Sequence, residues 1–157
     1  QTHRKIYLYD TYEGMPEPTD KDIDIHGVPY RLLWKKEKEF LSVSLDEVKK
    51  NIFSTGYPKE NIIFVKGMVQ DTIPNTVPKQ IALLRLDTDL YESTYHELFH
   101  LYPKTTSQGV IIIDDYGHFQ GSQEATEKYL SQNPQKVLLH RIDYSCIVWI
   151  KPSPTQK

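Results

Sequence analysis

The hydrophobic positions of the chain follow two patterns, short apolar runs and runs with helical spacing. Five apolar runs are typical of strands and lie at residues 5–9, 61–65, 80–86, 110–113 and 146–150. Leu45, Val48 and Ile52 repeat at helical spacing, which predicts a helix that ends before Gly56. Similar spacing predicts two later helices, one that begins at Ser93 and stops before Pro103 and one over residues 122–132.

Polar residues mark several of the element ends. Ser44 has the sequence context of a helix N-cap, and Glu47 stands three residues later, as in a capping box. Residues 19–40 carry mixed charge without a steady period, so we expect an irregular excursion there. Residues 143–145 separate two apolar segments, 137–142 and 146–150, which predicts a closing hairpin.

The order of these elements predicts an α/β fold. Apolar strands that alternate with helices favour a mostly parallel sheet whose strands are buried on both faces, and the closing hairpin adds an antiparallel edge. We expect a single domain over residues 1–152 and a tail at 153–157. The chain begins with Gln1 and enters an apolar strand within a few residues, which suggests that it was cut from a longer one.

Composition excludes several classes of partner. Nineteen Lys and Arg against 21 Asp and Glu give a formal net charge of −2, so no basic surface for nucleic acid is expected. No apolar stretch approaches the ~20 residues of a membrane span, and nothing resembles a signal peptide, which favours a cytoplasmic protein. The single cysteine, Cys146, excludes an internal disulfide.

Aspartates follow three of the predicted strands. Asp10 ends the first, Asp87 and Asp89 follow residues 80–86, and Asp114 and Asp115 follow residues 110–113. The carboxyl ends of parallel strands meet at one edge of a sheet, so four of these carboxylates should converge. Aspartate also ends strands as an ordinary turn former, but four uncompensated carboxylates in one cleft are costly. A hard cation, Mg²⁺ before Ca²⁺ or Mn²⁺, would offset that cost.

The motifs around these aspartates resemble those of a known family. Residues 83–94, with Asp87-Thr88-Asp89, and residues 109–117, with Asp114-Asp115, are similar to the macrocin O-methyltransferases, as are residues 9–16. The resemblance spans nearly all of residues 4–152. It implies a Rossmann-like class I methyltransferase that uses S-adenosylmethionine and acts on sugar hydroxyls. The family's Gly-rich turn after an earlier strand has no counterpart here, so the sheet is expected to be N-terminally truncated.

The resemblance also implies catalytic and metal-binding roles. Asp87, Asp114 and Asp115 would ligate Mg²⁺, with substrate oxygens completing its shell. Asp89 would be the general base; the alternative is that Asp87 both ligates the metal and accepts the proton while Asp89 orients the substrate. Arg85 interrupts an apolar strand, and we expect it to pair with one of the clustered carboxylates.

Three residues are predicted on the cofactor side. Asp10 stands where Rossmann-like folds place an acid on the ribose hydroxyls. Tyr12 would pack near the adenine, and Gly67 would let the backbone approach it. The partner implied is a small-molecule sugar or glycosylated acceptor.

Two other functions fit parts of the same pattern. An apolar strand that ends in Asp-Thr-Asp is also typical of metal-dependent glycosyltransferases, although the second carboxylate pair favours a methyltransferase. An inactive methyltransferase fragment is the other alternative. A sheet without a central strand has unpaired backbone groups, so a homo-oligomer that associates through that edge is expected.

Overall fold

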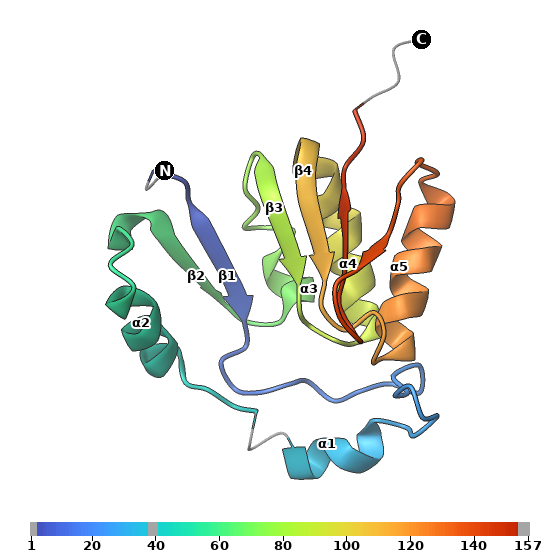
Figure 1. Ribbon diagram of the computed structural model, residues 1–157. Helices are drawn as coiled ribbons and strands as arrows, with labels where there is room; N and C mark the ends of the chain where they lie inside the picture. Colours follow the sequence, from blue (N-terminus) through green and yellow to red (C-terminus); the bar gives the residue numbers. More distant parts are fainter. Residues whose placement is uncertain (1–2, 38–40, 154–157) are drawn as a thin grey trace.

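The structure is a computed structural model that describes residues 3–37 and 41–153 (Figure 1). Strands and helices alternate along the described chain, as predicted. The strands are β1 (Ile6–Asp10), β2 (Ile62–Lys66), β3 (Ile81–Leu86), β4 (Thr105–Ile113), β5 (His140–Arg141) and β6 (Ile147–Ile150). The α-helices are α1 (Arg31–Glu37), α2 (Leu45–Ser54), α3 (Val69–Thr72), α4 (Tyr91–Leu101) and α5 (Gln120–Gln132). Short 3₁₀ turns occupy Lys59–Asn61 and Tyr102–Lys104. None of the helices described is both long and apolar enough to cross a bilayer.

The strands form two separate sheets. β1 and β2 pair in parallel, while the second sheet has the order β3-β4-β6-β5. Within it β3 and β4 are parallel, and β6 runs antiparallel to both β4 and β5. The α/β class and the C-terminal antiparallel hairpin are therefore confirmed, and the pairing is mixed, because β1 with β2 and β3 with β4 are parallel while both ladders of β6 are antiparallel. β1 and β3 lie beside each other in Figure 1 without a shared ladder, so within the described residues each has an edge that no strand covers.

The expectation that the strands are buried on both faces is wrong for the larger sheet. Leu84 and Leu86 of β3 and Ile111 and Ile113 of β4 pack into one core with residues of α3, α4 and α5. The alternate side chains face the other side, where Leu83 is 60% exposed. The side-chain period of a strand is two, and among the described residues these helices cover only one face, so side chains on the other face are left exposed.

The boundaries of several elements differ from those predicted. The segment expected to be irregular contains helix α1, and its last residues, 38–40, lie outside the described chain. Helix α4 begins at Tyr91 rather than Ser93, because Tyr91 N donates a 2.8 Å hydrogen bond to Asp22 Oδ1, 69 residues away. Strand β4 extends back to Thr105, and β5 keeps only two of the six residues expected. The predicted tail lies outside the described residues except for Ser153.

The helix cap at Ser44 is confirmed. Ser44 Oγ accepts a 3.3 Å hydrogen bond from Glu47 N, which satisfies one of the free N–H groups at the start of α2. Gly56 follows the helix with a φ of +76°, a left-handed conformation that glycine adopts without strain.

The segment between β1 and α2 crosses the carboxyl ends of the strands (Figure 1). Asp22, 1% exposed, anchors it, since its carboxylate accepts hydrogen bonds from Thr19 N and Oγ1 as well as from Tyr91 N. Gln120 N, at the start of α5, donates to Ile23 O (2.9 Å). The segment therefore holds the first turns of α4 and α5 in place beneath the strand ends.

Candidate active site

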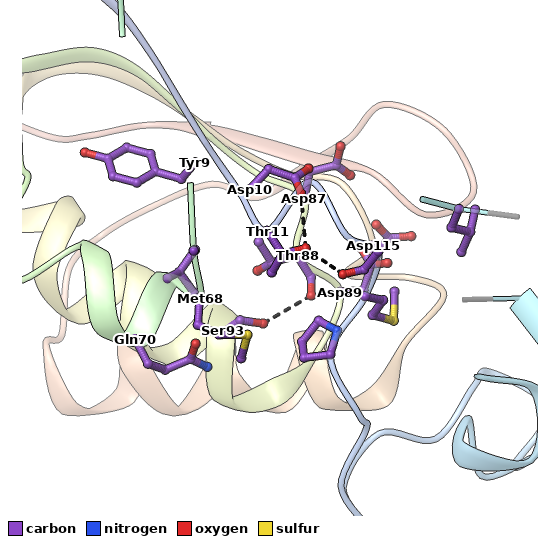
Figure 2. A pocket seen from close by; sticks show the side chains of 16 residues that line it. Tyr9, Asp10, Thr11, Met68, Gln70, Asp87, Thr88, Asp89, Ser93 and Asp115 are labelled. Atoms are coloured by element: carbon purple, nitrogen blue, oxygen red, sulfur yellow. Dashed lines mark hydrogen bonds between the residues drawn. The ribbon is translucent and has the colours of Figure 1, made fainter. Parts of the chain in front are cut away.

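A cavity of about 360 Å³ opens at the carboxyl ends of β1, β2 and β3. Acidic, polar and apolar residues from five separate segments line it. They are Tyr9, Asp10, Thr11, Gly14, Met15, Pro16, Leu41, Gly67, Met68, Val69, Gln70, Asp87, Thr88, Asp89, Ser93 and Asp115. Figure 2 shows Tyr9, Met68 and Gln70 on one side of the cavity and Asp89 and Asp115 on the other. One cavity thus joins most of the residues predicted for cofactor binding and for chemistry.

Three of the predicted aspartates form a cluster with the geometry of a cation site. Asp87, Asp114 and Asp115 each place a carboxylate oxygen within 4.8 Å of the other two. Mg²⁺ holds oxygen ligands at about 2.1 Å in an octahedron, so two of its ligands lie at most about 4.2 Å apart. Adjacent ligands of an octahedral ion lie only about 3 Å apart, so carboxylate oxygens separated by up to 4.8 Å would have to move closer together, by up to about 2 Å, to surround such an ion. The donor set, all oxygen, fits a hard divalent cation.

Arg85 bridges two members of this cluster. Its Nη1 lies 2.7 Å from Asp87 Oδ2, and its Nη2 lies 2.9 Å from Asp114 Oδ1. The pairing expected for Arg85 is therefore observed, with two carboxylates rather than one. Burial raises the pKa of Asp87, as does Asp114, and the Arg85 charge opposes that rise. One guanidinium therefore does not neutralise the cluster.

Asp89 lies beside the cluster on a tight turn. Its backbone is left-handed, with a φ of +63°, which costs about 1 kcal/mol or more for a residue other than glycine. Leu90 N donates to Thr88 O across this turn (2.6 Å). Burial raises the pKa of Asp89, and the nearby Asp115 raises it further. A carboxyl with a pKa raised in this way holds a proton at neutral pH, so it can accept one from a substrate only when nearby positive charge lowers its pKa.

The sequence analysis missed an acid behind this turn, Glu97 of α4. Glu97 is only 4% exposed, and its Oε2 accepts a 2.8 Å hydrogen bond from Thr88 Oγ1. Burial raises the pKa of Glu97 to about 8, against a smaller lowering by the Thr88 hydroxyl. The sequence does contain a signal for it. Glu97 occupies the same helical stripe as the buried Leu98 and Leu101, where a carboxylate is unusual.

The residues predicted on the cofactor side are not all in the cavity. Asp10 and Gly67 line it, and Gly67 N donates to Asp10 O (3.0 Å). Gly67 has a φ of +137°, and a Cβ there would lie 3.0 Å from Thr72 Cγ2, so the backbone needs glycine at this point. Tyr12 is not among the lining residues. It is 6% exposed, and its N–H donates to Asp10 Oδ1 (2.6 Å), so it braces the turn that carries Asp10.

The sequence of this chain matches one protein family over nearly its whole length. The family described as macrocin O-methyltransferase (TylF) matches residues 1–151. The chain belongs to the macrocin O-methyltransferase family. The predicted family is thereby confirmed, and it is a family of methyltransferases rather than of glycosyltransferases.

Characterised members of the macrocin O-methyltransferase family align with almost all of this chain. A tetracenomycin 4'-O-methyltransferase of Streptomyces olivaceus, named for a dimethoxy-rhamnosyl substrate, is 31% identical over 148 residues, which are 94% of this chain and 55% of that protein. The demethyldecarbamoylnovobiocin O-methyltransferase of Streptomyces niveus is 30% identical over 93% of this chain and 55% of its own length. The chain thus spans about half the length of these relatives.

Solved structures agree on the fold. The O-methyltransferase NovP superposes with a TM-score of 0.84 at 29% identity, covering 96% of this chain and 61% of NovP. The calicheamicin methyltransferase CalS11 superposes with a TM-score of 0.62 at 22% identity, over 96% of this chain and 61% of CalS11. The predicted Rossmann-like methyltransferase fold is therefore confirmed.

Proposed function

We propose that the protein is an O-methyltransferase that moves a methyl group from S-adenosylmethionine to a hydroxyl of a sugar or glycosylated small molecule. One observation carries the proposal: a single cavity joins Asp10 and Gly67 to Asp87, Asp89 and Asp115. The relatives in Streptomyces olivaceus and Streptomyces niveus are named as O-methyltransferases, and the first is named for a rhamnosyl group. A cytoplasmic location is part of the proposal.

We propose that Asp87, Asp114 and Asp115 hold Mg²⁺. Their oxygens lie within 4.8 Å of one another, and burial together with the neighbouring Asp114 raises the pKa of Asp87 in spite of the Arg85 charge. A bound Mg²⁺ would supply positive charge that stabilises the negative charge developing on the acceptor oxygen.

Asp89 is the proposed general base. S-adenosylmethionine supplies the electrophilic methyl group, and Asp89 takes the proton that the acceptor hydroxyl loses. Positive charge held by the neighbouring aspartates favours the ionised, proton-accepting form of Asp89. Asp87 is the alternative acceptor, but its Oδ2 already accepts a hydrogen bond from Arg85 (2.7 Å), which makes it the weaker base.

Asp10 and Gly67 are the proposed cofactor-binding residues. The Asp10 carboxylate, at the end of β1, would accept hydrogen bonds from the ribose hydroxyls of S-adenosylmethionine. Gly67, at the end of β2, would let the backbone come close to the adenosine. Tyr12 would act indirectly, because its N–H bonds to Asp10 Oδ1 and so orients that carboxylate.

Calorimetric titration with S-adenosylhomocysteine, with and without Mg²⁺, tests this proposal. We expect micromolar binding of S-adenosylhomocysteine and none of a nucleotide sugar, which serves as the control ligand. The Asp10→Asn variant should weaken S-adenosylhomocysteine binding at least tenfold, since each ribose hydroxyl bond to a charged acceptor contributes about 1.5–3 kcal/mol. Absence of S-adenosylhomocysteine binding under all conditions would refute the proposed activity for this chain and leave its family membership intact.

We also propose that the protein self-associates through its uncovered strand edges. Among the described residues, β1 pairs only with β2, and β3 pairs only with β4. Unpaired N–H and C=O groups on such edges are ready to pair with another chain. Light scattering coupled to size exclusion should therefore detect dimers or larger species, and a strictly monomeric protein would contradict this proposal.

A further inference from the structure

Glu97 is a buried acid for which the proposed chemistry has no use. It is 4% exposed on the face of α4 that packs against the sheet, next to the fully buried Leu98. An apolar side chain would be accommodated there without the cost of removing a carboxyl group from water. Its hydrogen bond with the Thr88 hydroxyl, 2.8 Å long, connects it to the turn that carries the active-site aspartates.

Thr88 stands between Asp87 and Asp89 and is held at two points. Its hydroxyl donates to Glu97, and its carbonyl oxygen accepts from Leu90 N (2.6 Å) and from Ser93 Oγ (3.1 Å). With both the side chain and the carbonyl held, the peptide groups on either side of Thr88 cannot rotate freely. The left-handed φ of Asp89 needs such support, because only the surrounding structure keeps a residue in that conformation.

We propose that the Thr88–Glu97 hydrogen bond is a positioning device that sets the directions of the Asp87 and Asp89 carboxylates. This inference rests on the proposed function, in which Asp87 ligates Mg²⁺ and Asp89 accepts a proton. Ligands and bases must be held to within about 0.5 Å, and the groups behind them supply that constraint. Glu97 and Thr88 are therefore positioning residues that act through their neighbours, not catalytic residues.

A purely structural role for Glu97 is the alternative, and a double variant separates the two. Thr88→Val with Glu97→Met replaces both hydrogen-bonding groups by apolar groups of similar size. Such a paired replacement leaves stability nearly unchanged or higher, because no buried polar group is left without a partner. Thr88→Ser and Glu97→Gln are matched controls that keep the donor and the acceptor.

The decisive readout is the affinity for Mn²⁺, measured by calorimetry on the purified protein as a probe for the divalent site. We expect the double variant to bind Mn²⁺ about 10–100-fold more weakly, the range seen when groups that orient metal ligands are removed. The two controls should bind within a few-fold of the wild type. Equal affinity of the double variant and the wild type would overturn the inference.

If the wild type binds no Mn²⁺, that result counts against the proposed metal site but not against the positioning role of Thr88 and Glu97. A second measurement tests the positioning role in that case. Backbone chemical shifts and the HN–Hα coupling of Asp89 report its left-handed φ. We expect them to change in the double variant and to persist in Thr88→Ser. Suppose that the wild type binds no Mn²⁺ and that the Asp89 signals of the double variant equal those of the wild type. The inference would then be overturned, because the turn would not depend on this hydrogen bond.

Discussion

The buried Glu97 predicts an unusual dependence of stability on pH. Burial raises the pKa of Glu97 from an ordinary value of 4.5 to about 8 in the folded protein. Below pH 4.5 the group is protonated in both the folded and the unfolded state, so its ionisation costs nothing. Between pH 4.5 and 8 the folded protein retains a proton that the unfolded chain releases, so the free energy of unfolding falls as the pH rises.

Replacement of Glu97 by Gln removes this titration and keeps the acceptor for the Thr88 hydroxyl. The interval from 4.5 to about 8, at ~1.4 kcal/mol per pH unit, gives an upper value of about 5 kcal/mol. Relaxation and water penetration reduce such penalties, so we expect a gain of about 2–4 kcal/mol for Glu97→Gln at pH 8. At pH 5 the same variant should differ from the wild type by less than about 1 kcal/mol.

Urea unfolding at pH 5 and pH 8, followed by circular dichroism, measures these differences. The exposed Glu124 of α5 provides the control, since Glu124→Gln should change the free energy of unfolding by about the same small amount at both pH values. A stabilisation by Glu97→Gln that is equal at pH 5 and pH 8 would refute the reasoning, because the effect would then not come from ionisation of the buried carboxyl.

Three further predictions follow from the site and the core. Asp114→Asn should weaken divalent-cation binding at least tenfold in calorimetry, and an unchanged affinity would remove Asp114 from the ligand set. Arg85→Met should strengthen Mn²⁺ binding about fifteenfold, because a unit charge ~5 Å from a divalent ion opposes its binding by about 1.7 kcal/mol in a water-like dielectric; weaker binding would instead show that Arg85 orients the ligands. Leu98→Ala, which empties a fully buried position, should lower the free energy of unfolding by about 2–5 kcal/mol, and a loss below about 1 kcal/mol would contradict the tight packing between α4 and the sheet.

The sequence by itself determined most of the strands, three of the helices and the acidic motifs. The apolar runs correspond to strands β1–β4 and β6, and the Ser44 cap lies at the start of α2. Both depend on interactions between residues close together in the chain, which spacing and residue type report directly. The convergence of Asp87, Asp114 and Asp115 was also predictable, because parallel strands bring their carboxyl ends to one edge of the sheet.

Only the tertiary structure decided the features that depend on distant partners. Helix α4 begins at Tyr91 because Asp22, far earlier in the chain, caps it, and no local signal reports that bond. The apolar sequence of β3 indicated a strand buried on both faces. Its exposed face depends instead on which side of the sheet the helices cover. The bond between Glu97 and Thr88 joins a helix face to a loop whose left-handed turn follows from the packing around it. Spacing can place carboxylates at one edge of a sheet, but the direction of each depends on contacts made after the chain has folded.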